Sequence, residues 1–110
     1  MEKYINIPVS GGDHFRFGLE VTMNVGILKM AVAPTDINGT MLNWELGQMS
    51  TTTNGQKEYH EINAVLPPTS HRMYIRLKGN GNGEGTIQNM WYEYLGHQDI
   101  PESVTLSNDK

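Results

Sequence analysis

The side chains best suited to recognising a ligand alternate along one short segment near the end of the chain. On the strand expected there, the residues divide into two opposite faces: Met90, Tyr92 and Tyr94 on one, and Asn89, Trp91 and Glu93 on the other. Only one of these faces can contact the core. If the tyrosine set is buried, Trp91 is displayed beside an amide and a carboxylate, as on a sugar-binding platform or a protein interface. If Trp91 faces inward instead, it is a core residue. Trp44 likewise is either displayed on the surface or packed in the core.

The glycine-rich segment at residues 79–85 is the second conspicuous motif. It is neither a dinucleotide-binding fingerprint nor a phosphate-binding loop, because the third glycine and the Lys-Ser/Thr pair are missing. Asn80, Asn82 and Glu84 offer oxygens at alternate positions for calcium, but the segment lacks the acidic spacing of an EF-hand loop. We therefore expect a mobile hairpin loop with several positive φ angles, and calcium binding is the alternative.

No constellation in the sequence indicates an enzyme. The chain has no cysteine, and its four histidines have no metal-ligand spacing on a common element. A G-x-S-x-G nucleophile motif is also missing. Glutamates are present, but a pair of them at the separation that a glycosidase needs can arise by chance in any sandwich. We expect no catalytic activity, no metal site and no cofactor.

Composition narrows the range of partners. The 110 residues suffice for one domain, and 37% hydrophobic residues with a net charge of −4 indicate a weakly acidic globular chain. An isoelectric point near 5.4 argues against nucleic acid, because phosphate binding needs a basic face. No apolar run is long enough to span a membrane. The first residues lack the apolar core of a signal peptide, so export by that route is not expected.

Alternating hydrophobicity defines the elements that must position these residues. Every second residue of three expected strands is apolar and predicted to face inward: Ile5, Ile7 and Val9; Phe15, Phe17, Leu19 and Val21; Met73, Ile75 and Leu77. Turn-forming residues separate the strands at 11–13, 23–26, 34–39, 54–55, 67–70 and 79–85. The pattern predicts an all-β fold, an antiparallel β-sandwich or jelly roll of about seven to eight strands, over residues 1–96.

The alternation stops after Leu95. Residues 97–110 are therefore expected to form a polar C-terminal tail that frays. The alternative is an arm that docks on a neighbouring subunit, with Ile100, Val104 and Leu106 as its partner-binding anchors.

Motifs at the two ends of the chain resemble the non-catalytic carbohydrate-binding modules of the family 6 kind. Residues 4–17 read Tyr-Ile-Asn-Ile-Pro-Val-x-Gly-Gly-x-x-Phe-x-Phe, and residues 71–79 (His-Arg-Met-Tyr-Ile-Arg-Leu-Lys-Gly) precede Trp-Tyr-Glu-Tyr at 91–94. The resemblance implies a jelly roll that binds sugars, with Trp91 stacking, Asn89 or Gln88 supplying an amide, and Trp44 as a further stacking residue. The chain departs from the family at Met90, where an acidic or amide residue is usual. It also lacks the stretch that precedes this opening in the family.

Two functions of different classes fit these observations. The first is a non-enzymatic structural interaction protein, a small decoration or staple protein of a phage capsid or similar assembly. It would bind the major shell protein, self-associate through an edge strand or the tail, and reside in the virion. The alternative is a carbohydrate-binding module that recognises a polysaccharide, extracellular as part of a larger secreted protein. Neither function involves nucleic acid or a membrane.

Overall fold

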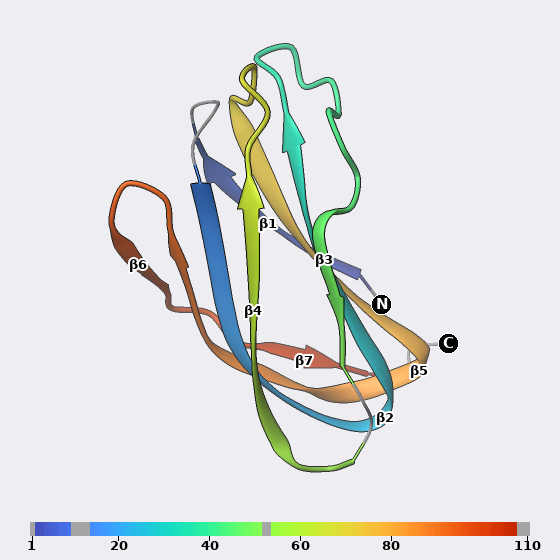
Figure 1. The fold of residues 1–110 in the computed structure, drawn as a ribbon. Helices are drawn as coiled ribbons and strands as arrows, with labels where there is room; N and C mark the ends of the chain where they lie inside the picture. Colours follow the sequence, from blue (N-terminus) through green and yellow to red (C-terminus); the bar gives the residue numbers. More distant parts are fainter. Residues whose placement is uncertain (1, 10–13, 52–53, 108–110) are drawn as a thin grey trace.

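The computed structural model describes residues 2–9, 14–51 and 54–107, and the regular structure in these ranges consists of strands alone. The strands are β1 (Glu2–Pro8), β2 (His14–Thr35), β3 (Leu46–Ser50), β4 (Lys57–Val65), β5 (Arg72–Glu93), β6 (His97–Ile100) and β7 (Val104–Leu106). All seven belong to one antiparallel sheet (Figure 1), which confirms the predicted all-β class. The described residues contain no helix that is long and apolar enough to cross a membrane.

Strands β2 and β5 organise the sheet. Each has 22 residues, and their pairing runs from Arg16 opposite Glu93 to Thr35 opposite Arg72. Both strands curve strongly in their middle parts (Figure 1), so the sheet folds over into two layers. The first layer contains β1, residues 72–80 of β5, residues 27–35 of β2, and β3. The second layer contains β4, residues 14–22 of β2, residues 85–93 of β5, β6 and β7.

Two predicted turns lie at the bend between the layers, and both predictions were wrong. Residues 23–26 belong to β2 and residues 79–85 belong to β5, so neither segment is a loop. The β2–β5 register shifts between Met23 and Ile27. A Cβ atom on Gly26, whose φ is 67°, would overlap the carbonyl oxygen of Asn80. A Cβ atom on Gly85 would overlap the carbonyl oxygen of Thr22. The glycines thus allow two backbones to approach closely at a β-bulge, which sequence reasoning interpreted as a free loop.

The core lies between the two layers and contains all three predicted inward-facing sets. The seven residues expected inward on β2 and β5 are at most 2% exposed, and Ile5, Ile7 and Val9 are at most 8% exposed. Leu46 and Met49 of β3 and Tyr92 and Tyr94 pack against this core. The predicted connection at residues 11–13 lies outside the described residues.

Residues 97–107 are neither the polar tail nor the docking arm that the sequence predicted, because they contain two strands of the sheet. β6 pairs with residues 90–93 of β5, and β7 pairs with residues 85–87. Ile100, Val104 and Leu106 are only 9%, 4% and 2% exposed and belong to the core of their own chain. They are therefore not available as anchors on a neighbour. β6 begins with three polar residues and β7 has only three residues, so neither gives a clear apolar alternation, and this concealed both strands.

We predict that Leu106→Ala destabilises the fold by about 2–5 kcal/mol, the usual cost of truncating a buried leucine. The measurement is the free energy of unfolding in urea. Leu95→Ala is the matched control, because Leu95 is 83% exposed and its truncation should cost less than about 0.5 kcal/mol. Equal stability of Leu106→Ala and the unmodified chain would show that the segment is a tail after all.

Candidate functional site

Trp91 lies on the outer face of the second layer. Its neighbour Met90 is 1% exposed, and Tyr92 and Tyr94 pack against the core. The face with Met90, Tyr92 and Tyr94 is therefore the one that meets the core, and the structure selects the first of the two arrangements that the alternation allows. Trp91 itself is half-buried, together with Glu93 on the same face.

The indole of Trp91 lies over Gly18 of β2. Gly18 is directly opposite Trp91 in the β2–β5 register, and a Cβ atom on Gly18 would overlap the indole ring. The absence of a side chain at residue 18 thus makes room for the ring against the backbone of β2. The Nε1 atom of Trp91 donates a hydrogen bond to the Tyr59 hydroxyl of β4, at 3.0 Å.

Two further side chains contact the indole. The imidazole of His97 stacks on it, with ring centroids 5.3 Å apart and an interplanar angle of 26°. The Arg16 guanidinium carbon lies 5.3 Å from the indole centroid, in cation–π contact. Trp91, Tyr59 and His97 therefore form one aromatic surface across β4, β2, β5 and β6, which we call the Trp91 face.

Ionic contacts fix the surroundings of the Trp91 face. Arg16 donates to Glu61 and to Glu93, each at 3.2 Å, and so ties β2 to both of its neighbours. The Tyr59 hydroxyl donates to Glu61 at 2.8 Å. This hydrogen bond, followed by those from Arg16, holds the pKa of Glu61 below its ordinary value. Desolvation and the bond to Glu61 raise the pKa of Tyr59, so the phenol stays protonated as a donor.

A groove opens beside the Trp91 face where the strands are irregular. Between Gln88 and Trp91, β5 has one residue more than β2, and Asn89 takes a φ of 54° in this bulge. The Asn89 amide then donates to Glu20 at 2.9 Å. On the other side of β5, the ladder is interrupted between β6 and β7. The resulting groove holds about 580 Å³ and is lined by Glu20, Tyr59, Gln88, Asn89, Met90, Trp91 and residues 99–103.

The structure brings together three of the four predicted sugar-binding residues. Trp91, Asn89 and Gln88 all line the groove, whereas Trp44 does not. Trp44 is 56% exposed and lies in the segment that leads into β3 of the first layer. This separation places the two tryptophans on different parts of the sandwich.

Sequence reasoning missed the residues that hold the indole of Trp91, which are Arg16, Tyr59 and His97, and it also missed Glu20, the acceptor of the Asn89 amide. Only one sequence feature points to them. Gly18 is an outward glycine within an otherwise regular strand, and such a glycine indicates close approach of another group. The partners across β4 and β6 depend on strand register, which the sequence pattern does not specify.

The groove combines an aromatic surface with carboxylate, amide and hydroxyl groups. Such a set suits a polyhydroxyl ligand, whose C–H faces pack on aromatic rings and whose hydroxyls hydrogen-bond to the polar groups. Within residues 2–9, 14–51 and 54–107, no three histidine, cysteine or acidic side chains gather as a metal site.

We predict that Asp99→Asn lowers the pKa of His97. The hydrogen bond with Asp99, and then the contacts with Glu93, raise this pKa above its ordinary value. His97 therefore favours the fold below about pH 6.5, and this contribution is lost as the pH rises through the raised pKa. NMR titration of the imidazole measures the shift. Glu102→Gln, which alters the same groove without touching His97, should leave the pKa unchanged, and an equal pKa in Asp99→Asn and the unmodified chain contradicts the assignment.

No protein-family model and no curated protein matches this chain. Solved structures do match it. Tailspike protein 4 of bacteriophage CBA120, in the structure of its enzymatically active domain, gives a TM-score of 0.65 at 16% sequence identity, over 86% of this chain and 13% of that chain. A CBM4 carbohydrate-binding module gives a TM-score of 0.56 at 10% identity, over 92% of this chain and 61% of that one.

This chain thus spans less than two thirds of either matched protein. At such low identities the likeness shows the fold alone. The fold of this chain is an all-β sandwich of the jelly-roll type, similar to that of the CBM4 module.

Proposed function

We propose that this chain is a non-enzymatic carbohydrate-binding module that holds a polysaccharide in the groove beside Trp91. The observation that carries this proposal is the indole of Trp91, which lies over Gly18 at the edge of a groove lined by amide and carboxylate groups. The CBM4 likeness and the family 6 resemblance of the end motifs support it.

The groove is organised before a ligand arrives. Tyr59, Arg16 and His97 already hold the indole, so little side-chain freedom is lost on binding. A sugar ring would pack on the Trp91 face while its hydroxyls reach Glu20, Asn89 and Gln88. Hydrogen bonds to an ionised carboxylate are stronger than those between neutral groups, which favours Glu20 as the main acceptor.

The electrostatics of Glu20 support a role in binding rather than in glycoside hydrolysis. A glycosidase needs one carboxyl group whose pKa is raised, so that it can donate a proton to the leaving group. In this groove the hydrogen bond from Asn89 and the nearby Lys57 lower the pKa of Glu20. Glu20 therefore suits the acceptor of a hydroxyl hydrogen bond and not a general acid.

A second candidate is the structural role, as a decoration or staple protein in a phage virion. The observation in its favour is the fold shared with a bacteriophage tailspike protein. With Ile100, Val104 and Leu106 buried, attachment to a shell protein or to a second copy would use a sheet edge, at β1 or β3 in the first layer or at β4, β6 or β7 in the second. The glycan-binding role would place the chain outside the cell, within a larger secreted protein or on the surface of a phage virion.

We predict that Trp91→Ala weakens polysaccharide binding at least about 30-fold, the effect of removing a central aromatic anchor. Gly18→Ala should also weaken binding, because the added methyl group displaces the indole while β2 keeps its fold. Affinity electrophoresis through gels that contain a panel of soluble polysaccharides measures both effects.

Gly96→Ala is the matched control for Gly18→Ala, since a Cβ atom on Gly96 meets nothing within 4 Å. It should migrate like the unmodified chain in every gel. If no polysaccharide slows the migration of the unmodified chain, the result contradicts the proposal and favours the structural role. Retardation that Trp91→Ala leaves unchanged would place the site elsewhere.

A further inference from the structure

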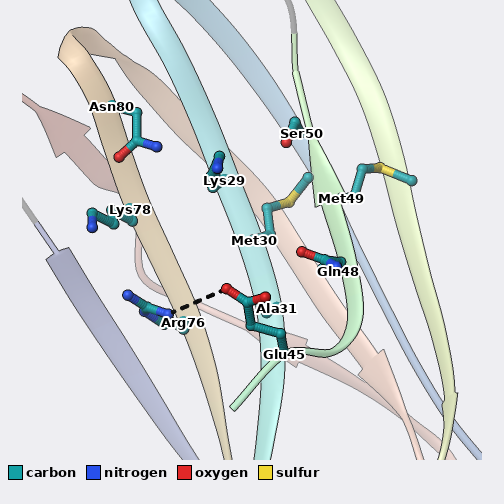
Figure 2. Close-up of a pocket in the computed structure, with 10 residues that line it drawn as sticks. All are labelled: Lys29, Met30, Ala31, Glu45, Gln48, Met49, Ser50, Arg76, Lys78 and Asn80. Atoms are coloured by element: carbon teal, nitrogen blue, oxygen red, sulfur yellow. Dashed lines mark ion pairs between the residues drawn. The ribbon is translucent and has the colours of Figure 1, made fainter.

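The outer face of the first layer carries a small cationic cleft, separate from the Trp91 face. Figure 2 shows Lys29 of β2 and Arg76, Lys78 and Asn80 of β5 around it, with Glu45 on the segment that leads into β3. The cleft holds about 90 Å³. Whole ligands of drug size occupy roughly 300–1,000 Å³, so this cleft suits a single chemical group.

Strand register explains both the hollow and its charge. Ala31 is opposite Arg76, and Lys29 is directly opposite Lys78. The short side chain of Ala31 leaves space among the longer side chains around it. Like charges opposite each other on neighbouring strands repel, so the Lys29–Lys78 pair is unfavourable in the absence of an anion.

The described residues supply too little negative charge to balance these cations. Lys78 and Arg76 share one oxygen of Glu2, at 3.5 Å and 3.2 Å. No ion pair and no hydrogen bond of a described residue involves the Lys29 ammonium. The Nε atom of Arg76 is buried, and no acceptor in the described part of the chain meets it.

Among the described residues, Glu45 is the acidic one that lines the cleft. Its carboxylate lies 4.0 Å from Nη1 of Arg76, at the outer limit of an ion pair, and its side chain is 57% exposed. It therefore covers the cleft loosely and can move aside for another anion.

We propose that this cleft binds the acid group, carboxylate or sulfate, of an acidic polysaccharide. Arg76, Lys29 and Lys78 hold the acid group, which replaces Glu45 as the partner of Arg76. The amides of Gln48 and Asn80 lie at the rim, where they meet the hydroxyls of the same sugar. This site shares no lining residue with the Trp91 groove, and its proposal is independent of the proposed function of that groove.

An aromatic pair next to the cleft favours a sugar as the source of the acid group. Tyr4 is opposite Arg76 in the β1–β5 register and is 43% exposed. Its ring meets Tyr74 edge-on, with centroids 6.3 Å apart, and the pair offers a surface for a sugar ring. Duplex DNA is less suited, because its backbone has a charge about every 1.7 Å, a density that the cations of one small cleft do not match.

The test measures binding by isothermal titration calorimetry in 50 mM salt to four probes: polygalacturonate, dextran sulfate, neutral dextran and a single-stranded DNA oligonucleotide. We expect binding to one or both acidic polysaccharides, and the stronger one identifies the acid group. Lys29→Gln should weaken that binding about tenfold, because a charge-assisted contact is lost. Glu45→Gln should strengthen it, because a competing carboxylate is removed.

Lys57→Gln is the matched control, since Lys57 lies on β4 of the second layer and pairs with Glu20. It removes the same charge and should leave binding of the acidic polysaccharide unchanged. Trp91→Ala separates the two sites: binding of the acidic polysaccharide that Trp91→Ala abolishes and Lys29→Gln leaves unchanged would place the acid group in the Trp91 groove and overturn the cleft. The proposal is overturned if neither acidic polysaccharide binds, if Lys57→Gln weakens binding as much as Lys29→Gln, or if the DNA binds as tightly.

Discussion

Strands β2 and β5 are hydrogen-bonded to each other through both layers of the sandwich, and the rest of the molecule is attached to this pair. Each of the other five strands pairs with one of the two. Because the pair bends at Gly26 and Gly85, its two halves face each other and bury their apolar sides in one core. Substitution of either glycine would push the two backbones apart at the bend. The relative position of the layers depends on this close approach.

The same pair positions both proposed binding surfaces, at places where its regularity changes. In the second layer, the bulge at Asn89 and the interruption after Ile100 open the groove, while Gly18 makes room for Trp91. In the first layer, regular register brings Lys29 opposite Lys78 and leaves a hollow over Ala31. Irregular backbone thus creates the larger groove, and side-chain size alone creates the smaller cleft.

The sequence predicted the features that depend on local alternation and missed those that depend on contacts between distant segments. The buried faces around Phe17 and Ile75 follow from a period of two and are as predicted. The outward position of Trp91 was one of two alternatives, because alternation alone does not say which face meets the core. The glycines at 79–85 form a close backbone contact that looks, in sequence, like a flexible loop. Likewise, β7 has only three residues, too few for an alternation that predicts the burial of Leu106, which its pairing with β5 explains.

A polysaccharide bound in the groove must contact the indole of Trp91. The chain has two tryptophans, so a ¹H–¹⁵N correlation spectrum shows two indole N–H signals. The signal that disappears in Trp91→Phe belongs to Trp91. Addition of soluble polysaccharides, one at a time, is the most direct measurement. We expect that at least one polysaccharide shifts the Trp91 signal and leaves the Trp44 signal in place. A Trp91 signal that no polysaccharide moves, or a shift confined to Trp44, would contradict it.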